Sequence, residues 1–183
     1  MKAFFAQSVG WLHRAVTGPQ RRRKLLTPLF ALVFLTVLAA AVCGSLFLDR
    51  LCGFAPFLPP WAATVFSLPF LFGGAGLWLW CVARFGMSKG TPVPVAPPPA
   101  LVTDGPYAYS RNPMMGGVFL VFLGIGIHFG SLWLTFVTTP LLIAVSIVVL
   151  KNVEEPELEL RFGEAYRQYR ERTPMLFPRL WRR

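Results

Sequence analysis

The stretch Pro113–Leu150, PMMGGVFLVFLGIGIHFGSLWLTFVTTPLLIAVSIVVL, runs for 38 residues without Asp, Glu, Lys or Arg. An α-helix crosses the hydrocarbon core of a bilayer with about 20 residues, so this stretch is too long for one span and suits two. Phe129, Gly130 and Ser131 lie near its middle, where a short turn divides it. The sequence therefore predicts a helical hairpin with spans at about 113–129 and 131–150.

Two further uncharged stretches precede the hairpin. Pro28–Leu48 contains 21 residues and Trp61–Ala83 contains 23, and each is long enough to span once. Only 14% of the residues are charged, against about 25% in soluble domains, while 55% are hydrophobic. We therefore expect an all-α integral membrane protein with four transmembrane helices, at about 28–48, 61–83, 113–129 and 131–150.

The net charge of +10 has a topological explanation. With four spans, every Lys and Arg except Arg50 falls on the side that carries both termini. The positive-inside rule then places both termini in the cytoplasm, which for a bacterium means the inner membrane. Residues 1–27 are predicted to be a basic interfacial segment, uncleaved, with an amphipathic helix over about 1–16. We expect membrane lipids, and no nucleic acid, as partners of these charges.

The three cysteines and two histidines show no metal-ligand spacing, so no metal site is predicted.

Two cytoplasmic segments carry more information. The first, residues 84–112, is expected to be extended because it is rich in proline. Its helix-breaking prolines are Pro92, Pro94, Pro97, Pro98 and Pro99.

The second cytoplasmic segment, Glu154–Tyr169, repeats apolar residues at helical spacing and predicts one amphipathic helix, which Gly163 weakens. Glu154 and Glu155 begin it directly after the last span. Carboxylates so close to hydrocarbon are costly unless they are paired or functional. They are interpreted either as helix capping or as a site for a cation or for hydroxyl groups.

Three ordered blocks in this half resemble a known superfamily. They are LVTDGPYAYSRNPMMGG at 101–117, the pair Glu154-Glu155, and FGEAYRQYRERTPMLFPRL at 162–180. Together they resemble the isoprenylcysteine carboxyl methyltransferases and phospholipid methyltransferases, which are multi-span membrane enzymes. These enzymes bind S-adenosyl-L-methionine in a pocket facing the cytoplasm. The resemblance implies one membrane methyltransferase domain at 28–183, with the cofactor-site half at 91–180.

The resemblance also implies a set of cofactor-binding residues. They are Leu101, Val102, Gly105, Tyr107, Arg111, Asn112, Pro113, Met114, Met115, Glu154 and Glu155. Asn112 stands where many members have His, and Met115 where they have Tyr. Gly124 and Gly126 resemble a glycine pair of the phospholipid methyltransferases, or else they serve close helix packing. Catalytic and acceptor-binding residues are not identified.

The predicted activity is transfer of a methyl group from S-adenosyl-L-methionine to a lipophilic or small acceptor at the cytoplasmic membrane face. Since no His or Cys is placed as a base, catalysis is expected to come mainly from proximity. Two alternatives stay open. An NADPH-dependent membrane reductase has a similar tyrosine-rich C-terminal block, and a non-catalytic lipid-binding membrane protein would account for Asn112 and Met115.

Overall fold

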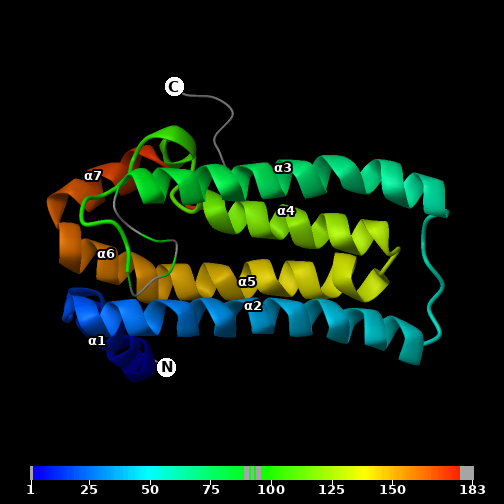
Figure 1. The fold of residues 1–183 in the computed structure, drawn as a ribbon, viewed down its shortest axis with the longest axis horizontal. Coiled ribbons are helices and arrows are strands. Elements are labelled where there is room, and N and C mark those ends of the chain that lie inside the picture. Colours follow the sequence, from blue (N-terminus) through cyan, green and yellow to red (C-terminus); the bar gives the residue numbers. More distant parts are fainter. Residues whose placement is uncertain (1, 89–90, 92, 94–95, 178–183) are drawn as a thin grey trace. The chain divides into compact units, whose positions relative to one another are not determined.

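A computed structural model describes residues 2–88, 91, 93 and 96–177, and every regular element in these residues is helical (Figure 1). The elements are α1 Lys2–Thr17, α2 Gln20–Leu51, α3 Pro60–Met87, η1 Gly105–Ala108, α4 Pro113–His128, η2 Trp133–Thr138, α5 Thr139–Val149, η3 Leu150–Glu154, α6 Glu155–Phe162 and α7 Glu164–Arg172. Element η1 is a 3₁₀ turn, whereas η2 and η3 are π-helical. The predicted all-helical class is confirmed for these residues. Pro92 and Pro94 of the proline-rich segment, and Pro178 to Leu180 of the third block, lie outside them.

Three helices are long and apolar enough to cross a membrane: Leu25–Leu51, Pro60–Met87 and Trp133–Phe162. Helix α4 is apolar too, but it has 16 residues. At 1.5 Å per residue it is ~24 Å long, short of the ~30 Å hydrocarbon core. A membrane protein with at least three spans is supported, and the fourth span stays a prediction.

The single amphipathic helix predicted over 154–169 is wrong. The helix that starts at Trp133 continues through η3 into α6 and reaches Phe162, and α7 begins only at Glu164. Between them Gly163 has φ 55° and ψ −126°, a backbone conformation that residues with a Cβ rarely adopt. Gly163 therefore ends one helix instead of merely weakening it.

The chain forms two compact units, residues 1–32, 80–113 and 146–183 in the first and residues 33–79 and 114–145 in the second. The second unit has a core of Val118, Phe122 and Leu134. Its helices approach closely at glycines. A Cβ on Gly74 would lie 2.7 Å from the Gly117 carbonyl oxygen, and one on Gly124 would lie 2.8 Å from the Leu71 side chain. These contacts support the close-packing interpretation of the glycines in α4.

The predicted break at 129–131 is confirmed in the second unit. Helix α4 ends at His128, and Gly130 turns the chain with φ 60°. The Ser131 hydroxyl oxygen accepts the Leu134 N–H at 3.0 Å and donates to the Asp49 carboxylate, which also accepts the Trp133 N–H at 3.1 Å. This arrangement satisfies backbone donors that the start of a helix leaves without partners.

In the first unit α1 packs against η3 and α6. Its inner face buries Leu12 and Val16, and His13 Nδ1 lies 3.5 Å from Glu157 Oε1. Gly18 and Pro19 separate α1 from α2. The helical state predicted for the N-terminal segment is confirmed, while its position at the membrane surface stays a prediction.

Candidate functional site

The segment before α4 is held in a fixed path in the first unit. Gly105 opens η1 with φ 57°, and a Cβ there would lie 3.4 Å from Arg84 Nε. Asp104, just before it, forms an ion pair with Arg84 of α3. The turn signal Asp-Gly-Pro of the sequence thus becomes a 3₁₀ turn anchored on α3.

The end of this segment is fastened to the chain that follows α7. The Arg111 N–H donates to the Pro174 carbonyl at 2.8 Å. Asn112 donates twice to the Met175 carbonyl, from its backbone N–H at 3.0 Å and from Nδ2 at 3.1 Å. The Ser110 hydroxyl donates to the same carbonyl at 3.2 Å. The Asn112 side chain therefore helps to hold the segment before α4 against the chain that follows α7. Its second Nδ2 proton and its side-chain oxygen are left for other partners.

Arg111 joins this segment to the pair of glutamates. Its Nη1 lies 2.8 Å from Glu155 Oε1, and only 9% and 11% of the two side chains are exposed. The same Nη1 lies 3.5 Å from the Tyr166 hydroxyl of α7. The charge of Glu155 is thus compensated inside the protein, which a buried carboxylate requires.

Tyr166 and Tyr169 lie near this ion pair, and Tyr107 contacts Tyr169. The Tyr169 hydroxyl donates to the Tyr107 carbonyl at 2.7 Å, and the Tyr107 ring stacks on Phe85 with centroids 5.1 Å apart. The Tyr107 hydroxyl also shares a hydrogen bond with Cys81. Burial raises the pKa of Tyr107 well above its usual value, and Cys81, Tyr169 and the carboxylate of Glu154 raise it further. Burial likewise raises the pKa of Tyr166 to about 12. Both phenols stay protonated at neutral pH.

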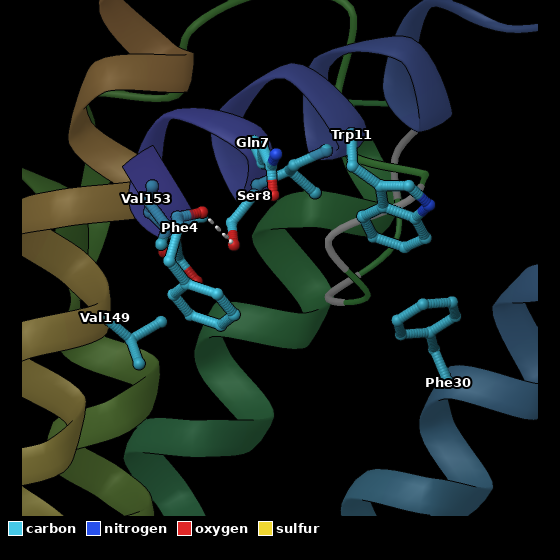
Figure 2. A pocket seen from close by; sticks show the side chains of 9 residues that line it. Phe4, Gln7, Ser8, Trp11, Phe30, Val149 and Val153 are labelled. Atoms are coloured by element: carbon cyan, nitrogen blue, oxygen red, sulfur yellow. Dashed lines mark hydrogen bonds between the residues drawn. The ribbon is translucent and has the colours of Figure 1, made fainter. Parts of the chain in front are cut away.

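Glu154 is in a different environment from its neighbour. Among the residues that the structure describes, no side chain or backbone donor pairs with its carboxylate. It lines a pocket of about 480 Å³ in the first unit. Figure 2 shows this pocket from close by. The other lining residues are Phe4, Gln7, Ser8, Trp11, Leu12, Phe30, Val149 and Val153.

A carboxylate without a partner at an apolar pocket attracts a cation or hydrogen-bond donors, because leaving it uncompensated is costly. Within the described part of the chain, no group of three or more His, Cys, Asp or Glu side chains is arranged to hold a metal ion. The pocket and Glu154 therefore suit an organic ligand with a positive or donor-rich end and an apolar body.

The predicted site residues divide between the two units. Met114 and Met115 belong to the second unit. The first unit contains all the others, which are Leu101, Val102, Gly105, Tyr107, Arg111, Asn112, Pro113, Glu154 and Glu155. Within the first unit, the contact of Arg111 with Glu155 brings the segment before α4 and the start of α6 together. Sequence reasoning missed Cys81, Phe85 and Met175, because the first two resemble any apolar residue of a span and the last acts through its backbone.

The part of the chain that contains these residues is similar to known proteins. The family model for phospholipid methyltransferase matches residues 63–165. A curated relative, the protein-S-isoprenylcysteine O-methyltransferase of Schizosaccharomyces pombe, is 39% identical over 84 residues. This alignment covers 43% of the chain and 33% of the relative, so the chain matches about a third of that protein's length.

Proposed function

Because the chain belongs to the phospholipid methyltransferase family, we propose that it transfers a methyl group from S-adenosyl-L-methionine to a lipophilic or small acceptor at the cytoplasmic membrane face. The observation that carries the proposal is the contrast between the two glutamates. Glu155 is neutralised by Arg111, whereas the carboxylate of Glu154 faces a pocket with no partner among the described residues. Glu154 lies inside the region that matches the family.

The residues present fit a cationic cofactor. S-adenosyl-L-methionine supplies a methyl group already activated on a sulfonium, and it also carries an amino group and ribose hydroxyls. In the proposal Glu154 accepts hydrogen bonds from such donors and offsets positive charge. Tyr107, whose protonated hydroxyl lies near this carboxylate, adds no second negative charge. The remaining contacts are proposed for Leu101, Val102, Gly105, Asn112 and Pro113, with Met114 and Met115 following them in the chain.

The role proposed for the protein in the reaction is positioning. A methyl transfer in line with the leaving sulfur needs the acceptor aligned and water excluded, and alignment alone supplies about 7–11 kcal/mol at best. The Arg111–Glu155 ion pair and the hydrogen bonds of Asn112 to Met175 hold the segment before α4 in place. The lining around Glu154 is mostly apolar.

Calorimetric titration of the purified protein with S-adenosylhomocysteine tests the proposal. Saturable binding is expected for the wild type, and at least tenfold weaker binding for Glu154→Gln, which removes one charge and keeps the shape. Glu164→Gln is the matched control, because Glu164 lies on the exposed first turn of α7. Circular dichroism and the Tm check that all three proteins are folded.

The outcomes separate the alternatives. Unchanged binding by Glu154→Gln would remove Glu154 from the cofactor site. Saturable binding of NADPH without binding of S-adenosylhomocysteine would replace the methyltransferase by a reductase. If folded wild-type protein binds neither compound, the non-catalytic lipid-binding protein is the better description.

A further inference from the structure

Helix α1 is joined to α2 by a short connection that is not helical. Gly18 and Pro19 form it, and Pro19 has no backbone N–H with which to continue α1 into α2. A Cβ on Gly18 would lie 2.9 Å from the Arg14 carbonyl oxygen, so the chain passes close to the last turn of α1 here. A few residues between two elements are where a hinge absorbs a change of direction. Gly18 and Pro19 therefore allow α1 to turn while both helices stay intact.

The apolar contact that holds α1 in place is small. Helix α1 has 16 residues and packs against η3 and α6. Its side chains Leu12 and Val16 are buried, whereas Phe4 is 68% exposed and Trp11 is 47% exposed. An element that buries few apolar side chains opens at a lower free energy than the core of the same protein. Helix α1 is thus an element that can open while the rest of the first unit stays folded.

A polar contact joins α1 to α6. His13 Nδ1 lies 3.5 Å from Glu157 Oε1, and Arg161 Nε lies 3.5 Å from the same oxygen. Only 4% of the Glu157 side chain is exposed, so its charge needs compensation inside the protein. Arg161 belongs to α6 itself and stays beside Glu157 when α1 moves away. Departure of His13 therefore leaves no bare carboxylate behind, and α1 can leave and return.

Helix α1 also forms one wall of the pocket that Glu154 lines. The lining residues on α1 are Phe4, Gln7, Ser8, Trp11 and Leu12. Figure 2 shows Trp11 of this wall beside Phe30 of α2, with ring centroids 5.7 Å apart. Glu154 lies on η3, and Val149 on α5. A movement of α1 would therefore widen the pocket without displacing the carboxylate.

We propose that α1 is the gate of this pocket: it turns about Gly18 and Pro19, and it closes when His13 reaches Glu157. A closed α1 holds the ligand against the opposite wall, and an open α1 lets it enter and leave. The inference rests on the proposed function for the identity of the ligand, S-adenosyl-L-methionine. It adds control by an element that precedes residue 63, where the match to the family begins. His13 and Glu157 are positioning residues, because they act on the ligand through α1.

Hydrogen exchange of the ligand-free protein in phosphatidylcholine nanodiscs measures the opening of α1 directly. With rates divided by those of the unfolded chain, amides of α1 are expected to be less protected than those of α6. His13→Ala is expected to lower the protection of α1 by about tenfold more and to leave α6 unchanged. His13→Gln keeps a donor for Glu157 and is expected to restore most of the protection.

Arg14→Ala is the matched control for this series, because Arg14 is the exposed neighbour of His13 on the same helix. It is expected to leave the exchange of α1 unchanged. Protection of α1 equal to that of α6 in the wild type would overturn the proposal. Equal effects of His13→Ala and Arg14→Ala would do so as well.

A reversible lock tests the effect of the gate on the ligand. His13→Cys and Glu157→Cys are combined with Cys43→Ser and Cys52→Ser, and a bifunctional methanethiosulfonate links the two new thiols, while Cys81 is buried. The association and dissociation rates of S-adenosylhomocysteine are both expected to fall about tenfold in the linked protein and to recover after reduction. An association rate that the link does not change would overturn the proposal. If the double cysteine variant does not fold, the His13 series decides.

The two measurements separate this proposal from the one on which it rests. Exchange of α1 that depends on His13, without any binding of S-adenosylhomocysteine, would reject the cofactor and keep the gate. Binding of S-adenosylhomocysteine at rates that the link does not change would keep the cofactor and reject the gate.

Discussion

At the scale of single residues, two adjacent glutamates lie in different surroundings. One residue advances an α-helix by about 100°, so neighbouring side chains face different surroundings. Glu155 faces Arg111 of the segment before α4, and Glu154 faces the pocket bordered by α1. Replacing either residue therefore tests a different property, stability for Glu155 and ligand binding for Glu154.

The Arg111–Glu155 pair gives a prediction about stability. Arg111→Met leaves a buried carboxylate without compensation and is expected to lower the free energy of unfolding by about 3–5 kcal/mol. The double variant Arg111→Met, Glu155→Leu removes both charges and is expected to recover much of this loss. Thermal unfolding of the two single variants and the double variant measures the coupling. Strictly additive losses would show that the two side chains do not interact.

The protonated state of Tyr166 gives a prediction about pH. Burial raises its pKa in the folded protein from 10.0 to about 12, so folding favours the neutral phenol. The contribution of protonated Tyr166 to the free energy of unfolding is therefore complete below pH about 10 and is lost as the pH rises toward about 12. Between these values we expect the wild type to lose on the order of 2 kcal/mol more than Tyr166→Phe. Denaturant unfolding at several alkaline pH values measures the difference, and parallel curves for the two proteins would contradict it.

At the scale of elements, glycines decide where helices end. Gly163→Ala is expected to lower the free energy of unfolding by about 1–2 kcal/mol, because a backbone φ of 55° strains any residue with a Cβ. The space around Gly163 is open, so the cost comes from the backbone alone. Gly10→Ala is the matched control. It lies within α1, also in open space, and is expected to be neutral or stabilising by about 0.5–1 kcal/mol. Chemical denaturation compares the two, and equal effects would remove the argument from backbone strain.

The same elements show what the sequence can predict. The hairpin break at 129–131 was predictable because an uncharged run of this length must turn once. Gly163 was not recognised as a helix end, because the residues on both sides keep helical spacing. The π-helical turns η2 and η3 leave no pattern in the sequence, since they change hydrogen bonding without requiring particular residue types.

At the scale of the whole molecule, the distribution of charge predicts the orientation in the membrane. Cys52, exposed in the connection between α2 and α3, is expected to react with a membrane-impermeant maleimide on intact cells. Cys81 is buried and should not react. In a Cys52→Ser background, a cysteine substituted at Thr103 is expected to react only after the membrane is permeabilised. Labelling of both positions from the same side would contradict the four-span topology.

The candidate site was only partly predictable, for reasons that belong to the whole chain. The resemblance to the methyltransferases identified the glutamates and the segment before α4 by their order in the sequence. It contained no information on which glutamate pairs with Arg111, because this depends on how helices pack. The pocket was not predicted at all, since it needs α1 to lie against η3, and α1 precedes the region that matches the family.

The π-helical turn Leu150–Glu154 has one more consequence. A π turn holds one residue more than an α-helical turn, and the extra residue is taken up within that turn. A homologue with one residue fewer and a plain α-helical turn at this point would therefore keep its two carboxylates in nearly the same directions. A single-residue gap there in an alignment is thus compatible with an unchanged pair of glutamates, provided that the π turn is lost with it.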